Sequence, residues 1–122
     1  MIHHVLISLA SNHHQTENLQ EAQRRLLQVL ENCSLSAVIW TQPIGGCGRA
    51  RYLNQLLRGS TSMSVEELES RLKEEERLMG RTAEEKPQGI IRIDLDLMQY
   101  DDCRYHLRDW ERPYIKGLLD RF

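Results

Sequence analysis

Residues 91–97 read Ile-Arg-Ile-Asp-Leu-Asp-Leu, and this stretch decides the fold of the chain. Apolar and polar side chains alternate in it with a period of two, which is typical of a β-strand with one buried face. The apolar side chains of Ile93, Leu95 and Leu97 are expected to face a core, and Asp94 and Asp96 to face the other side of the sheet. Such a strand requires partner strands and a covering layer of helices.

Three more segments predict the partner strands. Residues 5–10 form an apolar run rich in strand formers, which ends at the turn signal Ser11-Asn12. Residues 35–41 and 52–59 are two further strand candidates, and a loop rich in proline and glycine separates them. We expect the strand over 52–59 to return antiparallel to the one before it.

Two amphipathic helices are expected between these strands. In the first, Thr16 is placed to cap the helix, and apolar residues recur at helical spacing from Leu19 until the break at 32–34. In the second, Ser64 and Glu67 form a capping box, and a glycine ends the helix. The resulting order of elements, βαββαβ, predicts a ferredoxin-like α+β fold, an antiparallel sheet with two helices on one face. The tail is expected to hold an extended piece and one short helix.

The bulk composition fits a single domain over residues 1–122, which carries a formal net charge of -2. This near-neutral charge gives no reason to expect nucleic acid, because phosphate binding requires a basic patch. Neither a signal peptide nor a membrane span is visible, and three widely spaced cysteines match neither a disulfide framework nor a zinc motif. We therefore expect a cytoplasmic protein that binds no nucleic acid and no membrane. The sequence leaves its oligomeric state open.

Asp94 and Asp96 are candidate metal ligands. Residues two apart on a strand share a face and lie about 6 to 7 Å apart at the backbone. Two such carboxylates repel each other unless a cation lies between them or one is protonated, and Mg²⁺ accepts carboxylate oxygens while keeping room for phosphate. Two alternatives stay open, a solvent-facing edge strand and an ion pair between Asp94 and Arg92. Structural or surface roles, not metal binding, are expected for four histidines: His3, His4, His13 and His14.

A second group of candidate ligands flanks the proline- and glycine-rich loop. Thr41 begins this loop, and Tyr52 and Asn54 follow it. The amide of Asn54 offers donors and acceptors that match the edge of a flat heterocycle, and the ring of Tyr52 offers a stacking surface. The alternative is a connecting loop whose polar side chains satisfy one another.

Five motifs occur along the chain in a fixed order: Leu9-Ala10-Ser11-Asn12; Thr41-Gln42-Pro43-Ile44-Gly45; Tyr52-Leu53-Asn54; Glu66-Glu67-Leu68 with Glu76 and Gly80-Arg81; and Arg92-Ile93-Asp94-Leu95-Asp96. In order and spacing they resemble the motifs of the 6-hydroxymethyl-7,8-dihydropterin pyrophosphokinase family, with alanine in place of a glycine in the first. The resemblance covers most of the chain, from residue 5 to about residue 100.

The resemblance implies transfer of a pyrophosphoryl group from ATP to 6-hydroxymethyl-7,8-dihydropterin in folate biosynthesis, with two Mg²⁺ ions. It implies that Asp94 and Asp96 bind the metal and that Arg81 and Arg92 act beside them in catalysis. The pterin would be bound by Thr41, Ile44, Gly45, Tyr52 and Asn54. The nucleotide would be bound by Lys73, Glu76, Arg81, Arg108 and Lys116.

The chain departs from the family pattern at the nucleotide lid. Residues 82–89 carry Glu84 and Glu85 and a single lysine, Lys86, where the family carries arginines and a tryptophan. An acidic lid repels a triphosphate. The signature arginine falls one place late, at Arg92, and the chain is shorter than the family pattern. These departures favour the alternative function, a non-catalytic descendant that binds a small ligand or a partner protein.

Overall fold

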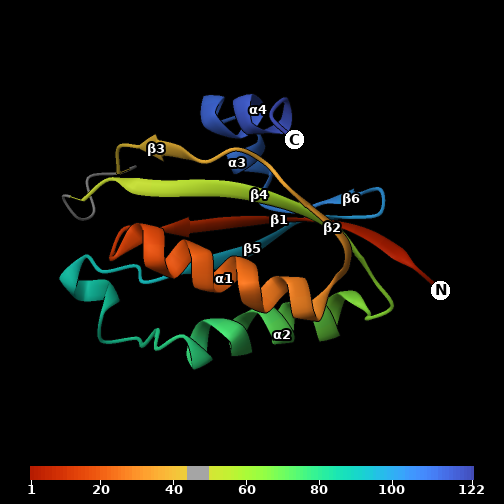
Figure 1. The fold of residues 1–122 in the computed structure, drawn as a ribbon, viewed down its shortest axis with the longest axis horizontal. Coiled ribbons are helices and arrows are strands. Elements are labelled where there is room, and N and C mark those ends of the chain that lie inside the picture. Colours follow the sequence, from red (N-terminus) through yellow and green to blue (C-terminus); the bar gives the residue numbers. More distant parts are fainter. Residues whose placement is uncertain (44–49) are drawn as a thin grey trace.

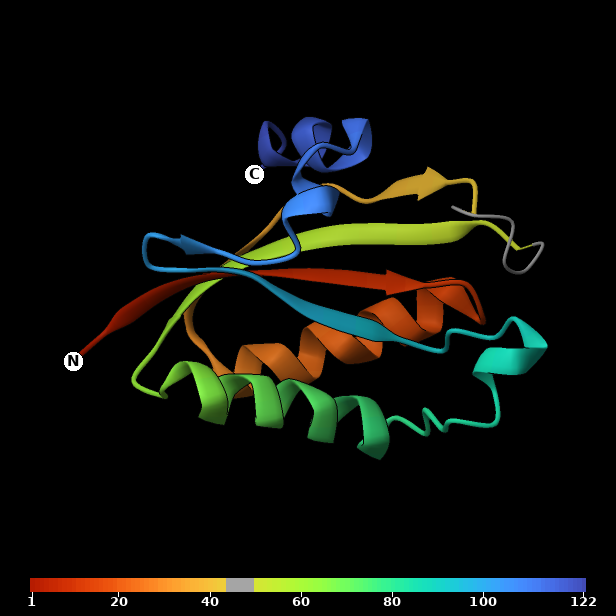
Figure 2. The same cartoon turned by 180° about the vertical axis from the view of Figure 1, so that it is seen from behind.

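The computed structural model describes residues 1–43 and 50–122, which form one sheet with helices on both faces (Figures 1 and 2). The strand order is β2-β4-β1-β5-β6, β3 also pairs with β4, and every pairing is antiparallel. The strands are β1 (His3–Ser11), β2 (Glu31–Leu35), β3 (Ile39–Thr41), β4 (Tyr52–Thr61), β5 (Asp94–Tyr100) and β6 (Cys103–Arg104). The helices are α1 (Gln15–Val29), α2 (Val65–Leu78), α3 (Leu107–Trp110), α4 (Pro113–Leu119) and the short 3-10 turn η1 (Lys86–Gln88). The α+β prediction with an antiparallel sheet is confirmed.

The main core lies between the sheet and the helices α1 and α2, which cover the same face of the sheet (Figure 1). Odd-numbered residues of the central strands point into it, including Ile7 of β1, Leu57 of β4 and Leu95 of β5. They pack against Leu26 of α1, Leu72 of α2 and their neighbours. The alternation in the sequence therefore assigned this face correctly.

The two helix starts differ from each other. Ser64 caps α2 as predicted, because its hydroxyl accepts from Glu67 N at 3.2 Å while Glu67 Oε1 accepts from Ser64 N at 3.0 Å. The prediction that Thr16 caps α1 is wrong. That helix begins at Gln15, and the cap position is His14, in the left-handed region at φ 43°. The side chain of Asn18 bonds the carbonyl of His13 at 2.6 Å, so the turn before the helix is closed without Thr16.

The segment predicted as one strand over 35–41 is two strands. Ser36 exchanges two bonds of 2.9 Å with Leu56, Ser36 N to Leu56 O and Leu56 N to Ser36 Oγ, and this side-chain bond interrupts the ladder between β2 and β3. Residues 31–35, expected in part as a helix break, form β2 directly after α1. Strand β5 begins at Asp94 rather than at Ile91, because the backbone of Ile91 is bonded to Asn12.

A smaller second core lies on the opposite face of the sheet, where the tail folds back as β6, α3 and α4 (Figure 2). Trp110 anchors it, since its indole N–H donates to the carbonyls of Met98 at 3.2 Å and Tyr105 at 3.0 Å. The tail forms two helices, so the expectation of one short helix in it is wrong.

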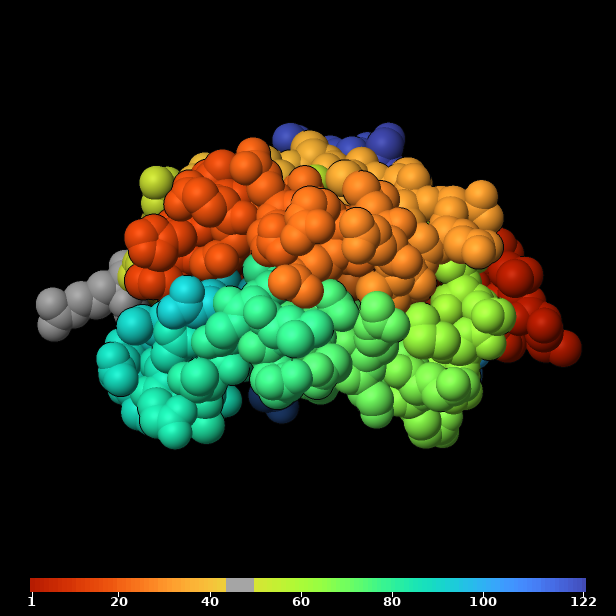
Figure 3. All heavy atoms as spheres, turned by 60° about the horizontal axis from the view of Figure 1, so that its bottom comes forward, coloured from red at the N-terminus to blue at the C-terminus, as the bar shows by residue number. Residues whose placement is uncertain are grey.

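In the described residues, no helix has the length and apolarity needed to cross a membrane. Figure 3 shows the face formed by α1 and α2.

Candidate active site

A cavity of about 280 Å³ opens on the sheet face opposite α1 and α2. Its floor is formed by even-numbered strand residues, and its other wall by the tail. Six residues predicted from the sequence line it: Thr41, Tyr52, Asn54, Arg81, Asp94 and Asp96. The remaining lining residues are Ser8, Ala10, Gln42, Lys86, Ile91, Asp109, Tyr114 and Ile115.

The register of the sheet explains why these residues meet. Ala10 of β1 pairs with Asn54 of β4 on one side and with Asp94 of β5 on the other. Cross-strand partners share a face, so the three residues form one row across the floor of the cavity. Ser8 and Asp96 form the next pair in the same direction. The small side chain of Ala10 leaves open space between the amide of Asn54 and the carboxylate of Asp94.

Asp94 and Asp96 are not on a fully solvent-facing strand, because their side chains are only 34% and 21% exposed. Burial raises the pKa of Asp96 to about 8, and the neighbouring Asp94 carboxylate raises it in the same direction. Two partly buried carboxylates on one face repel each other, and this arrangement favours a bound cation. Their oxygen donors suit Mg²⁺.

Arg81 is the cation that lies at this pair. Its Nη1 donates to the carbonyl of Ile93 at 3.0 Å and to Asp94 Oδ1 at 3.1 Å, and it lies 3.2 Å from Glu76 Oε2. The alternative in which Arg92 pairs with Asp94 is wrong. Arg92 makes a two-pronged ion pair with Glu85, at 2.6 Å and 3.3 Å. Because residues 91–93 precede β5, strand alternation does not fix the direction of Arg92, and its role in catalysis stays a prediction.

Glu76 joins helix α2 to the strand that carries the two aspartates. Its side chain is 5% exposed, and its Oε2 accepts from the backbone N of Leu95 at 2.7 Å. Burial raises the pKa of Glu76, and this effect outweighs the opposing ones of the Leu95 hydrogen bond and of Arg81 and Lys73. Glu76 therefore holds the strand in place, and the prediction that it contacts the nucleotide stays untested.

A second hollow, of about 230 Å³, lies at the end of α2 and shares Arg81 and Lys86 with the first. Lys73, Arg77 and Glu76 also line it. Four of its lining side chains are cationic, which suits phosphate groups. The sequence set two glutamates of the lid against ATP, Glu84 and Glu85, and of these Glu85 forms an ion pair with Arg92.

Two predicted nucleotide ligands lie elsewhere in the described part of the chain. Arg108 on α3 and Lys116 on α4 are exposed, and neither lines the two hollows described above. Lys116 lies 3.4 Å from Glu111. The sequence missed their placement because it did not predict two separate tail helices. Two predicted pterin ligands, Ile44 and Gly45, fall outside the described residues.

Asn54 is 3% exposed and already has partners. Its Nδ2 donates to Thr41 Oγ1 at 2.8 Å and to the carbonyl of Ile39 at 3.2 Å, which fixes β3 against β4. These bonds match in part the interpretation in which polar groups of the loop satisfy one another. Both side chains still line the cavity.

Comparison with known proteins identifies the family of the chain. The family model described as 7,8-dihydro-6-hydroxymethylpterin-pyrophosphokinase matches residues 6–119. The chain belongs to this pyrophosphokinase family. The resemblance inferred from the five motifs is confirmed at the level of the family.

Three plant relatives of this pyrophosphokinase-family chain align over nearly all of it. The folate synthesis bifunctional protein of Arabidopsis thaliana is 30% identical over 125 residues, which cover 94% of this chain and 26% of the relative. The mitochondrial folate synthesis bifunctional proteins of Arabidopsis thaliana and Pisum sativum are 34% and 31% identical over 128 residues. These alignments cover 96% and 94% of the chain, and 23% and 24% of the relatives. The chain thus spans about a quarter of the length of the relatives it matches.

Ser11 and Asn12, from the first motif of the pyrophosphokinase family, hold the approach to β5. Ser11 Oγ donates to the carbonyl of Arg92 at 2.7 Å. Asn12 Nδ2 donates to the carbonyl of Gly89 at 2.9 Å, and its Oδ1 accepts from Ile91 N at 2.7 Å. Ser11 and Asn12 therefore position the strand of Asp94 and do not line the cavity, whereas Ala10 of the same motif does. From the residues alone, Ser11-Asn12 is interpreted as a turn, and the four residues together as a family motif.

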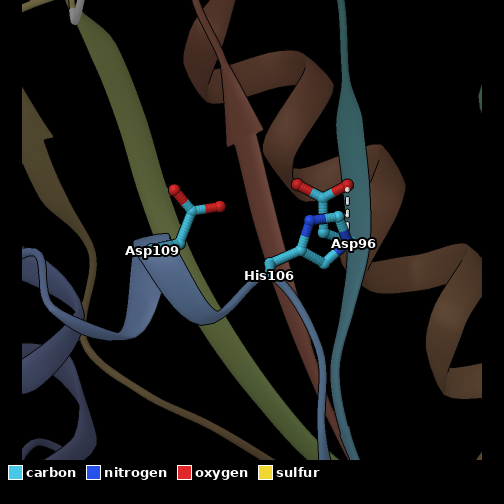
Figure 4. Close-up of side chains that lie close together, drawn as sticks. All are labelled: Asp96, His106 and Asp109. Carbon is cyan, nitrogen blue, oxygen red and sulfur yellow. Dashed lines mark ion pairs between the residues drawn. The ribbon is translucent and has the colours of Figure 1, made fainter.

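The tail supplies lining residues that sequence reasoning missed in this family member. Asp109 and Tyr114 line the cavity, and burial raises the pKa of Tyr114. His106 Nε2 lies 3.9 Å from Asp96 Oδ1 (Figure 4). The parity of β1 could have identified Ser8 and Ala10, because both point away from the core. No sequence signal placed the tail over the sheet.

Proposed function

We propose that the chain transfers a pyrophosphoryl group from ATP to the hydroxymethyl group of 6-hydroxymethyl-7,8-dihydropterin, with AMP as the second product. Membership of the pyrophosphokinase family supports this activity and its place in folate biosynthesis. The observation that carries the proposal is the cavity that joins Asp94 and Asp96 to Thr41, Tyr52 and Asn54. We further propose that residues 1–122 act as one pyrophosphokinase domain, in the cytoplasm.

The donor set of the cavity fits Mg²⁺. Asp94 and Asp96 would hold the metal through carboxylate oxygens, the ligands that this hard cation prefers. When bound, Mg²⁺ neutralises negative charge that develops on the phosphates. The strand spacing of the two carboxylates and their partial burial are properties of the protein and are present without the metal.

The floor of the cavity is suited to a flat heterocycle. Ala10 leaves a gap between Asn54 and Asp94, and the aromatic side chains of Tyr52 and Tyr114 lie at its walls. We propose that the pterin lies in this gap with its polar edge toward Thr41 and Asn54. The hydroxymethyl group would then point to the aspartates. Positioning of this kind accounts for a large part of catalysis in phosphoryl transfer.

The phosphates of ATP would lie in the adjoining basic hollow. Arg81 and Lys86 line both spaces, so they are placed to contact a group that passes from one to the other. Lys73 extends the cationic side chains along α2. These residues act by charge and hydrogen bonding, which is how protein side chains stabilise a transferring phosphoryl group.

The second candidate function is a non-catalytic descendant of the family that binds a small ligand or a partner protein. One observation favours it. Arg81 is engaged by Asp94 and Glu76, Arg92 is engaged by Glu85, and Arg108 and Lys116 lie away from both hollows. The number of cationic side chains left to bind a triphosphate is then smaller than the family pattern implies.

The two candidates are separated by assaying AMP and the pterin pyrophosphate after incubation of the protein with ATP, Mg²⁺ and the dihydropterin. We expect both products to appear together. Asp94→Asn and Asp96→Asn should each lower turnover at least about a hundredfold, as loss of transition-state charge stabilisation does. Asp102→Asn, at an exposed aspartate after β5, is the matched control and should turn over normally.

Two outcomes count against parts of this proposal. Normal turnover in both aspartate variants would overturn the metal assignment. Pterin binding by a folded wild-type protein with no product at high protein concentration would overturn the kinase activity and favour the binding descendant. Circular dichroism of each variant establishes that the fold is retained.

A further inference from the structure

Asp96 meets two side chains of the tail, His106 and Asp109, which the proposed reaction does not use. One ligand atom each from Asp96, His106 and Asp109 lie within 4.8 Å of one another. Figure 4 shows that they come from β5, from the turn before α3 and from α3 itself, and that they converge on one space. Residues distant in sequence are thus brought together by the docking of the tail on the sheet.

The backbone holds His106 in this position. It lies in the left-handed region at φ 53°, at the cap of α3, and its carbonyl accepts from Asp109 N at 2.8 Å. Before His106 in the chain, Tyr105 N donates to the carbonyl of Met98 in β5 at 3.0 Å. After it, the indole N–H of buried Trp110 donates to the carbonyls of Met98 and Tyr105. The imidazole is therefore carried by a turn that is fixed to β5 on both sides.

Asp109 has a cation beside it that lies outside the cluster. Arg112 Nε lies 3.6 Å from Asp109 Oδ1, and this buried nitrogen has no hydrogen-bond partner in the described structure. The contact between the two is an ion pair and not a hydrogen bond. Asp96 and His106 also line a hollow of about 330 Å³ on the flank of β5, which gives a small cation a path to them.

We propose that Asp96, His106 and Asp109 form a binding site for a first-row transition-metal dication such as Mn²⁺ or Zn²⁺. Two carboxylate oxygens and one imidazole nitrogen suit these ions, whereas Mg²⁺ prefers ligands that are all oxygen. The imidazole nitrogen thereby favours transition metals over Mg²⁺, a distinction that the two carboxylates of Asp94 and Asp96 alone do not make. The inference rests on the proposed function only through Asp96, which both sites share.

The test is pulsed electron paramagnetic resonance of Mn²⁺ bound to the whole chain, without ATP or pterin. Coordination by His106 is expected to give an electron spin-echo modulation from a directly bound ¹⁴N nucleus. His106→Asn should abolish this modulation and weaken Mn²⁺ binding at least about tenfold, because loss of even an outer partner of a metal ligand costs this much. Asparagine tolerates the left-handed backbone that His106 adopts, so the variant should fold. Asp109→Asn should weaken Mn²⁺ binding in the same titration.

The matched control is His14→Asn. His14 is also left-handed, also precedes a helix, and lies 3.7 Å from the carboxylate of Glu17, but among the described residues it belongs to no group of three possible metal ligands. This variant should keep both the ¹⁴N modulation and the affinity. Mn²⁺ bound without ¹⁴N modulation, or no Mn²⁺ bound at all, would overturn the inference. This titration contains no nucleotide or pterin, so its result does not depend on turnover. A failure of the pyrophosphokinase proposal in the product assay can therefore be distinguished from a failure of the metal site.

Discussion

Asp96 places a titratable carboxyl group in a partly buried position, and the cost of ionising it should be visible in the stability of the protein. Its pKa is raised from 3.8 to about 8 in the folded state. Between these values the folded protein retains a proton that the unfolded chain has released, so the free energy of unfolding falls as the pH rises. Asp94 and Glu76 raise the pKa of Asp96 further and Lys73 lowers it, and the side chains of His106 and Asp109 also lie beside it.

Asp96→Asn should therefore be more stable than the wild type at pH 8 when divalent metal is removed by a chelator. We expect its Tm to be higher by at least about 3 °C, since a kilocalorie shifts the Tm of a domain this size by several degrees. The difference should shrink as the pH falls through 4 toward 3, because below 3.8 the wild-type carboxyl is protonated in both states. Differential scanning calorimetry over this range measures it, with Asp102→Asn as the control. A wild type more stable than the variant at pH 8 would contradict the prediction.

At the same scale, the sequence identified the residues whose direction a regular strand determines. Asp94, Asp96 and Asn54 follow strand alternation and line the cavity as expected. Arg92 lies before the first ladder bond of β5, so its direction depends on Glu85, a residue of the loop. No periodic pattern contains that information.

Among the elements, α2 and β5 are linked by the buried carboxylate of Glu76 in addition to their packing in the main core. Replacing Glu76 with alanine leaves the backbone N of Leu95 without an acceptor and removes a partner of Arg81. We expect a loss of about 3 kcal/mol in the free energy of unfolding, typical of breaking a buried charged hydrogen bond. Glu76→Gln keeps an acceptor for Leu95 N and should lose less. Urea denaturation measures both.

Glu75→Ala provides the comparison on the same helix. Glu75 is equally buried at 5% exposure, but its partners are Arg25 of α1 and Arg71. Both alanine variants should be destabilised, while only Glu76→Ala should weaken the binding of Mg²⁺ or pterin. Equal losses of binding in the two variants would show that Glu76 does not position β5.

The sequence predicted the long helices and most of the strands because their periodicity extends over many residues. It failed where a side chain replaces a backbone partner, as Ser36 does between β2 and β3. It also failed for α3 and α4, whose 4 and 7 residues are too few for a periodic pattern. Their formation depends on the apolar sheet face formed by Leu6, Leu56 and Met98.

For the whole molecule, the sheet separates two cores of unequal size. Trp110 is the largest member of the smaller core, and its indole holds the turn of His106 to β5. Trp110→Ala should cost about 3 to 5 kcal/mol, as large aromatic deletions in a core do. Trp110→Phe keeps most of the packing and should cost less. Hydrogen exchange should show faster exchange in α3 and α4, with little change in β1 and α1.

The Trp110→Ala variant also tests how far the candidate active site depends on the tail. Asp109 and Tyr114 come from the smaller layer, so Trp110→Ala should weaken pterin binding more than the drop in stability alone explains. Titration with pterin below the unfolding temperature separates the two effects. Unchanged exchange in α3 and α4 would indicate that the layer is held by contacts other than Trp110.

Arg81 gives the site one more property. Its guanidinium already serves as the counter-ion of Asp94, held there by the carbonyl of Ile93 and by Glu76. A divalent cation held by both aspartates would compete with this resident charge for Asp94, so its binding would be an ion exchange and not a simple addition. The guanidinium also lines the basic hollow, where it would be left to meet an incoming anion. Binding of a metal and exposure of a positive group to an anion would thus be coupled.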